Sequence, residues 1–289
     1  MSKYIRLHQK HFNFRKFVKA ALSEDVGDGD HTALSTIPKD HKGKMQLFAK
    51  ENGIIAGVEA AKEIFKIIDP KFKVKILISD GQTINPGDVV LTVEGNTQKL
   101  LTSERLVLNI MQRMSGIATK TNHLQNLCSG TKAKVIDTRK TTPGFRFFEK
   151  WAVVIGGGAN HRYGLFDMIL IKDNHIDFAG GIIHAIDAAN AYLKKTKKKL
   201  AIEVETRTLE DVRKVMSHGK VQRIMLDNYS VEQTLQAVEI IGEKYEIESS
   251  GGITEQTIAN YAKCGVDFIS VGALTHHIKS LDLSLKAVQ

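Results

Sequence analysis

Six short apolar runs in the second half of the chain constrain its fold more than any other feature. They are AKVI, MILI, LAIEV, RIML, YEIES and DFISV. The last four recur at about 22-residue intervals, a spacing typical of strands that alternate with helices. Amphipathic helical patterns such as LEDVRKVMSHG and VEQTLQAVEIIGEK lie between them. The chain from about residue 133 onward is therefore predicted to be an α/β domain with parallel strands.

Polar residues gather where each run ends, at 137–140, 172–175, Glu205, 227–228, 250–252 and Gly272. The carboxyl ends of parallel strands lie at one edge of a barrel or sheet, where α/β proteins place their active sites. We therefore expect an enzyme whose site is formed by these residues.

The first part of the chain has a different pattern. In KFKVKI, Phe72, Val74 and Ile76 alternate with lysines, and VVLTVEG indicates a further strand. The run EAAKEIFKII is typical of a helix. We predict a small α+β domain over residues 1–115, with the tail 276–289 packed against it, and a second domain over residues 116–275.

The amino-acid composition limits which partners and which cellular location we expect for this protein. A formal net charge of +9 makes nucleic acid, membrane surfaces and acidic metabolites candidate partners. The densest basic run, KKTKKK, indicates a solvated helix end. No apolar run approaches a membrane span, no signal-peptide pattern is present, and neither Cys128 nor Cys264 belongs to a paired motif. We expect a cytoplasmic protein with no membrane or nucleic-acid partner.

The cations Arg139, Lys140, Arg162 and Lys172 are expected to converge at the mouth of such a barrel. Guanidinium groups bind carboxylates and phosphates through paired hydrogen bonds, and lysine adds a point charge. The cations therefore predict a site for anions. The neighbouring His161 is either part of this site or a structural hydrogen-bonding residue.

Glu203 and Glu205 share one face of a predicted strand, and Asp227 ends the next strand. Mg²⁺ takes one or two carboxylates together with phosphate oxygens, so we predict a magnesium site here. Charge balance against the cations is the alternative, and the choice between Glu203 and Glu205 stays open.

The loops SSGGIT and SVGALT follow the last two strands. In α/β barrels a phosphate group is commonly bound by the loops after the last two strands. Glycines in these loops let backbone N–H groups approach the phosphate closely. Cations, carboxylates and a phosphate cradle suit a phosphorylated sugar diphosphate and a second anionic reactant. We expect displacement through an oxocarbenium-like state, driven by positioning and electrostatics.

Several motifs, in order along the chain, resemble the quinolinate phosphoribosyltransferase family. They are EDVGDGDHT, ERLVLNIMQRMSGIAT, DTRKTTPGFR, GGGANHRYGLFDMILIKDNH, IEVE, IMLDN, SSGGI and VDFISVGALTH. The resemblance implies an N-terminal α/β sandwich domain and a C-terminal incomplete α/β (TIM-like) barrel, in a homodimer or a higher oligomer. It also implies a Mg²⁺-dependent conversion of quinolinate and phosphoribosyl diphosphate into nicotinate mononucleotide, diphosphate and CO2, a step of NAD biosynthesis.

The resemblance further implies the role of each site residue. Arg139, His161, Arg162 and Lys172 would bind the two quinolinate carboxylates, and Arg105 would reach the site from the partner subunit. Lys140, Glu205 and Asp227 would be catalytic, with Lys140 at the phosphoribosyl diphosphate and the two carboxylates at its ribose and Mg²⁺. The phosphate group would be bound by Ser250, Gly251, Gly252 and Gly272, and Thr138, Val271 and Ala273 would be further substrate-binding residues.

Two alternatives were weighed against this hypothesis. One is a related enzyme that glycosylates another base, or a nicotinate phosphoribosyltransferase that does not decarboxylate; cations sufficient for two carboxylates argue against both. The other is a nucleic-acid-binding protein with an inactive barrel, which would interleave basic and aromatic residues. Aromatic residues make up only 7% of the chain, and the strand-end cations have acidic neighbours.

Overall fold

The structure is a computed structural model that describes residues 3–8 and 10–288, and it contains two compact units. The first unit comprises the described residues up to Asn122, the segment Thr142–Gly157 and the described residues from His277 onward. The second unit comprises His123–Thr141 and Gly158–His276. The predicted boundary at residue 115 falls inside a helix, and the domain limits remain predictions.

The first unit is built on an antiparallel sheet with the strand order β12-β1-β5-β3. The strands are β1 (Lys42–Ala49), β3 (Lys73–Ile76), β5 (Val89–Asn96) and β12 (Leu283–Val288), with the short pair β2 (Gly53–Ile54) and β4 (Thr83–Ile84) beside them. Alternate residues of β1, among them Leu47 and Ala49, are buried. Leu47 pairs with Leu91 of β5 and Leu285 of β12, so the end of the chain completes this sheet.

Helices of the first unit bury amphipathic faces. They are α1 (Lys3–His8), α2 (Phe14–Val26), α3 (His31–Thr36), α4 (Val58–Ile68), α5 (Thr97–Leu127, whose last turn belongs to the second unit) and α6 (Arg146–Ile155). In α4, Ile64 and Phe65 are fully buried, and Asp80 caps the helix start by accepting from the N–H groups of Val58 and Glu59.

Aromatic stacking places α6 in this unit. The ring of Phe147 stacks on Phe12 at a centroid distance of 4.4 Å, and Trp151 stacks on Tyr4 at 5.0 Å. Large aromatic side chains dominate the free energy of such cores, so α6 groups with the N-terminal helices although it follows a strand of the second unit in the chain.

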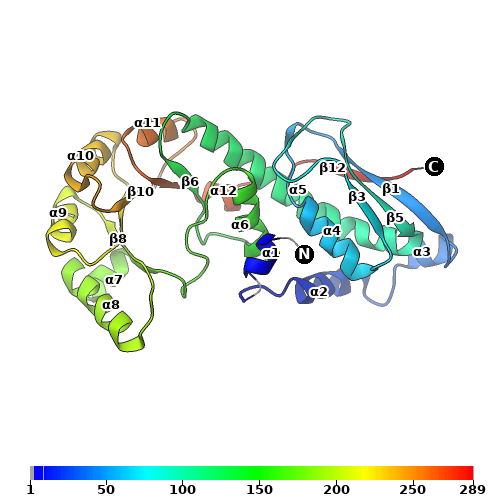
Figure 1. The fold of residues 1–289 in the computed structure, drawn as a ribbon, viewed down its shortest axis with the longest axis horizontal. Helices are drawn as coiled ribbons and strands as arrows, with labels where there is room; N and C mark the ends of the chain where they lie inside the picture. The colour runs from blue at the N-terminus through cyan, green and yellow to red at the C-terminus, as the bar shows by residue number, and fades with distance from the viewer. Residues whose placement is uncertain (1–2, 9, 289) are drawn as a thin grey trace. The chain divides into compact units, whose positions relative to one another are not determined.

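The second unit is a six-stranded, all-parallel sheet in the order β6-β11-β10-β9-β8-β7. Its strands are β6 (Lys134–Ile136), β7 (Ile169–Ile171), β8 (Ile202–Thr206), β9 (Arg223–Asp227), β10 (Glu246–Ser250) and β11 (Phe268–Ser270). These six strands correspond to the six apolar runs of the sequence. The sheet curves and ends at β6 and β7, and the predicted fold class, with an incomplete α/β barrel, is confirmed (Figure 1).

Helices α7 to α11 form the outer layer around these strands (Figure 1). They are α7 (Asp173–Phe178), α8 (Ile182–Thr196), α9 (Leu209–His218), α10 (Val231–Ile241) and α11 (Ile258–Lys263), followed by the short α12 (Ala273–His276). Thr208 caps α9, and Ser230 forms a capping box with Gln233 at the start of α10. These caps start each helix within a few residues of a strand end, which keeps the loops at that edge short.

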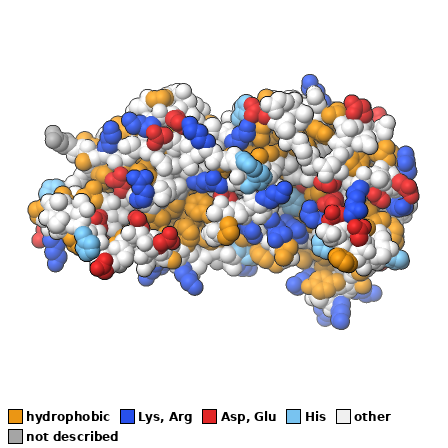
Figure 2. Space-filling model, turned by 180° about the vertical axis from the view of Figure 1, so that it is seen from behind, with side chains coloured by type: hydrophobic (Ala, Val, Ile, Leu, Met, Phe, Trp, Pro, Cys, Tyr) orange, Lys and Arg blue, Asp and Glu red, His pale blue; other side chains and the backbone are white. Residues whose placement is uncertain are grey.

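The surface carries charges of both signs. On the face drawn in Figure 2, lysine and arginine side chains are interspersed with acidic, hydrophobic and uncharged ones. Within the described chain, no helix is both long enough and apolar enough to cross a membrane.

Candidate active site

A pocket of about 810 Å³ opens where the strands of the second unit end. The residues predicted from the sequence that line it are Thr138, Arg139, Lys140, His161, Arg162, Lys172, Asp227, Ser250, Gly251, Gly252, Val271, Gly272 and Ala273. Segments far apart in the sequence thus meet at one cavity, because the parallel strands deliver their carboxyl ends to one edge.

Cations dominate one part of the lining, which Arg139, Lys140, Arg162 and Lys172 share. Burial lowers the pKa of Arg162, and the nearby positive charge of Arg139 lowers it further. A guanidinium of Arg162 donates to the carbonyl of Met168 at 3.3 Å. These two guanidinium groups are close enough to repel each other, and an anionic ligand bound between them would reduce the repulsion.

Lys172 forms an ion pair with Glu205, with 3.1 Å between Nζ and Oε2. The Asp173 N–H also donates to Glu205, at 3.3 Å. Glu205 is only 4% exposed and, within the described chain, is not among the pocket-lining residues. It therefore acts on the pocket from behind Lys172.

Asp227 lies near Glu205. Burial raises the pKa of Asp227, and the negative charge of Glu205 raises it further. Two carboxylates held close together are a hard oxygen donor set of the kind that Mg²⁺ prefers. Glu203, two residues earlier on the same face of β8, is fully buried and lies 3.1 Å from His161, which favours Glu205 in the choice that the sequence left open.

Asn228 fixes the end of β9. Its side-chain amide donates to Asp227 Oδ2 at 2.8 Å, and its backbone N–H donates to the Ser250 carbonyl at 2.8 Å. Asn228 has φ +57°, in the left-handed region that asparagine tolerates better than most residues. A Cβ at Gly251, where φ is +90°, would overlap the Asn228 side chain.

The second glycine loop is equally close-packed. A Cβ at Gly272 would lie 2.9 Å from His276 Nε2 and 3.2 Å from Lys140 Cδ. The Thr275 hydroxyl donates to the Lys140 carbonyl at 2.7 Å, which ties α12 to the segment that carries the cations. Only a glycine at position 272 leaves Lys140 and His276 in these positions.

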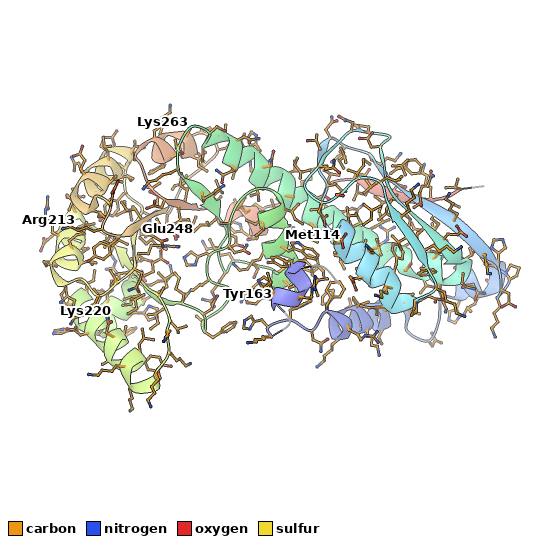
Figure 3. The ribbon with its side chains drawn as sticks, in the orientation of Figure 1. Met114, Tyr163, Arg213, Lys220, Glu248 and Lys263 are labelled. Carbon is orange, nitrogen blue, oxygen red and sulfur yellow. The ribbon has the colours of Figure 1, made fainter. Side chains whose placement is uncertain are left out.

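A buried ionic cluster lies beneath the cations. His161 Nε2 is 3.1 Å from Glu203 Oε2 and 3.4 Å from Glu248 Oε2. Arg223 donates to Glu248 at 3.2 Å, and its guanidinium lies 4.0 Å above the Phe268 ring. Figure 3 labels Glu248, on the inner side of β10. Both carboxylates are fully buried, so their charges need these partners.

The charges of this cluster are coupled. Burial, followed by the negative charge of Glu248, raises the pKa of Glu203 to about 7. Burial works against a charge on Glu248, but its contacts with His161 and Ser270 and the charge of Arg223 together outweigh burial and hold the pKa of Glu248 below its usual range. Burial works against a charge on His161, yet the two carboxylates outweigh it and raise the pKa of His161 to about 9.

A backbone contact opposes a second proton on this ring. The Arg162 N–H donates to His161 Nδ1 at 2.6 Å, so a proton on Nδ1 would face another N–H. The two carboxylates favour a charged imidazolium, but that form needs a proton on Nδ1, and this proton would break the hydrogen bond from the Arg162 N–H. We place the ring proton on Nε2, facing the carboxylates.

Several lining residues were missed in the sequence: Leu170, Met225, Glu248, Ile253, Thr254, Ser270 and His276. Four of them precede a predicted site residue by two positions, namely Leu170, Met225, Glu248 and Ser270. The period of two along a strand would have found these four. His276 follows Gly272 by one helical turn. Arg105 lies exposed on α5 of the first unit, and its role across a subunit interface stays a prediction.

Comparisons with known proteins identify the family. Residues 30–115 match the family described as quinolinate phosphoribosyl transferase, N-terminal domain, and residues 117–286 match its C-terminal domain. The chain is 46% identical to a nicotinate-nucleotide pyrophosphorylase (carboxylating), chloroplastic, of Arabidopsis thaliana, over 95% of this chain and 83% of that protein. It is 44% identical to a mitochondrial quinolinate phosphoribosyltransferase (decarboxylating) of Nicotiana tabacum, over 95% of this chain and 82% of that protein.

Solved structures show the same fold. NadC from Streptococcus pyogenes superposes with a TM-score of 0.89 at 39% identity, covering 95% of this chain and 96% of that one. The nicotinate-nucleotide pyrophosphorylase from Francisella tularensis superposes with a TM-score of 0.87 at 41% identity, covering 95% and 96%. The chain belongs to the quinolinate phosphoribosyltransferase family.

Proposed function

We propose that the pocket of the second unit binds quinolinate and phosphoribosyl diphosphate side by side. Quinolinate phosphoribosyl transfer with decarboxylation, in NAD biosynthesis, is the activity of this family member. The observation that carries the site assignment is the convergence of four cations, the strand-end carboxylate of Asp227 and two glycine loops on one pocket.

Quinolinate has two carboxylates and would occupy the part of the pocket lined by Arg139, Arg162 and Lys172, with Thr138 and His161 beside it. Guanidinium groups can bind a carboxylate with two parallel hydrogen bonds, which fixes the plane of the pyridine ring. Relief of the repulsion between Arg139 and Arg162 would add to the binding free energy.

Phosphoribosyl diphosphate would lie along Lys140 and the glycine loops. Its 5′-phosphate would meet backbone groups of residues 250–252 and 271–273, where a glycine lets the ligand approach closely. Glu205 and Asp227 would hold Mg²⁺ near the ribose, and this ion supplies positive charge for the departing diphosphate.

The chemistry then follows from positioning. The pyridine nitrogen forms a bond to the anomeric carbon as the bond from that carbon to diphosphate breaks. The resulting pyridinium nitrogen stabilises the electron pair left when the adjacent carboxylate departs as CO2, and a proton takes its place. This chain orients the ring, excludes water and balances the charges.

The assembly and compartment are also proposed. A homodimer would place Arg105 of one subunit at the quinolinate site of its partner. A cytoplasmic location stays a prediction, because relatives are named as chloroplastic in Arabidopsis thaliana and mitochondrial in Nicotiana tabacum.

An end-point assay tests the assignment. Purified protein, Mg²⁺ and phosphoribosyl diphosphate are incubated with quinolinate or nicotinate, and nicotinate mononucleotide and CO2 are measured. Product from quinolinate alone, lost in Arg139→Ala, is the expected result. Product from nicotinate would overturn the substrate assignment. Full activity of Arg139→Ala would overturn the proposed role of Arg139 in binding quinolinate.

A further inference from the structure

We propose that Glu203 and Glu248 are positioning residues that hold the His161 ring and, through it, the backbone of Arg162 in the arrangement that meets quinolinate. This inference rests on the proposed function, since it assumes that His161 and Arg162 face the substrate. Neither glutamate was assigned a role from the sequence motifs, where Glu203 was only an alternative to Glu205.

The first step is the contact of the ring with the two carboxylates. His161 Nε2 lies 3.1 Å from Glu203 on β8 and 3.4 Å from Glu248 on β10. These strands are separated by β9, so the ring bridges across one strand of the sheet. Neither contact has hydrogen-bond geometry, so the two carboxylates act on the ring through their negative charge, which favours a proton on the Nε2 that faces them.

The second step leads from the ring to the substrate side. The Arg162 N–H donates to Nδ1 of the oriented ring, and the His161 N–H donates to Asp137 Oδ1 at 2.9 Å. The side chain of Asn160 donates to the other oxygen of Asp137 at 2.7 Å. The backbone of residues 160–162 is therefore held by hydrogen bonds to buried groups. This fixes the backbone position from which the Arg162 side chain extends.

The carboxylates of Glu203 and Glu248 both lie near the guanidinium of Arg223. Arg223 lies on β9 between them and donates to Glu248 at 3.2 Å, while its other nitrogens bond to Glu246 at 3.0 Å. The guanidinium also stacks over Phe268. The positive charge of Arg223 adds to the contacts with His161 and Ser270 that keep the pKa of Glu248 low.

Stability alone does not account for this cluster. Within the described chain neither oxygen of Glu203 has a hydrogen bond of good geometry, and the residue is fully buried. A buried ion pair is often no more stable than well-packed apolar side chains in its place. Its location directly beneath two predicted substrate ligands points to a functional reason.

The test uses Glu203→Leu, which removes the acceptor at similar volume, and Glu203→Gln, which keeps one acceptor oxygen. We expect Glu203→Leu to raise the KM for quinolinate by about tenfold, the order of magnitude for removing one charged partner of the His161 ring, and to leave the KM for phosphoribosyl diphosphate within about twofold. Glu203→Gln should recover part of the loss. The matched control is Glu246→Gln, which changes the exposed partner of Arg223 and leaves the contacts of His161 in place.

Nitrogen-15 NMR of the histidine rings in the free enzyme gives a readout that needs no substrate. With His161 assigned by comparison with His161→Asn, wild type should show a protonated Nε2 and an unprotonated Nδ1, and Glu203→Leu should shift both signals. Unchanged ring signals, or equal increases of the two KM values, would overturn the proposal. Absence of quinolinate turnover in wild type would instead reject the proposed function, and the ring signals would still test the link from Glu203 to His161.

Discussion

The ammonium group of Lys172 lies 3.1 Å from the Glu205 carboxylate, which is almost completely buried behind it. The pair links a cation that lines the pocket to the carboxylate that raises the pKa of Asp227. One ion pair thus connects the two halves of the proposed site, the cations that would bind quinolinate and the carboxylates that would hold Mg²⁺.

Lys172→Met should therefore lower kcat/KM for quinolinate by about 30-fold or more, because removal of one partner leaves the buried Glu205 charge uncompensated. Steady-state kinetics measure this change. Lys220→Met is the matched control: Lys220 pairs with Asp187 at 3.1 Å, but both side chains are about half exposed. An exposed pair contributes little, so a comparable loss of activity in Lys220→Met would contradict the argument.

Gly272→Ala should displace Lys140 or His276, because the added methyl group would lie 2.9 Å from His276 Nε2 and 3.2 Å from Lys140 Cδ. We expect the KM for phosphoribosyl diphosphate to rise by about tenfold, the consequence of misplacing one charged contact. The KM for quinolinate should change much less. Equal changes in both constants would show that the glycine supports the whole pocket and not the phosphate end.

Asn228 allows backbone strain to be separated from the hydrogen bond to Asp227. Asn228→Ala loses the bond and places alanine at φ +57°, whereas Asn228→Gly loses only the bond. The alanine variant should be less stable than the glycine variant by about 1 kcal/mol, the cost of a left-handed alanine, while both lose activity. Urea denaturation and kcat measure the two effects.

Lys197→Gly is the control for the backbone term. Lys197 ends α8 at φ +55°. Glycine at this position should stabilise the protein by up to about 1 kcal/mol, since it adopts this conformation without strain, and activity should not change. If Lys197→Gly does not stabilise the protein, backbone strain would not explain the difference in stability between the two Asn228 variants.

Acid should destabilise the first unit through Asp69. A hydrogen bond from Lys99 at 2.7 Å, followed by one from the Lys71 N–H, lowers the pKa of Asp69. A carboxyl group whose pKa is lower in the folded state adds stability above its unfolded pKa, and this contribution is lost as pH falls through the folded pKa. Urea midpoints measured from about pH 6 down to pH 2 should fall more steeply for wild type than for Asp69→Asn. Parallel curves would contradict this assignment.

Much of the fold and of the site could be predicted from the sequence. Short apolar runs and βα spacing are local properties, and they placed all six strands of the second unit. Because parallel strands deliver their ends to one edge, the position of Asp227 at the end of β9 and of Gly272 after β11 predicted a shared site. The motif resemblance supplied the family and the chemistry.

The tertiary structure decided which charges meet. His161, Glu203 and Glu248 are separated by tens of residues, and only the register of β8, β9 and β10 brings their side chains together. Stacking of Phe147 on Phe12 likewise decided that α6 joins the first unit, a long-range contact that leaves no local pattern. Local propensity fixes the strands and their polar ends, whereas burial and the pairing of distant strands determine which carboxylate faces a ligand and which holds a histidine in place.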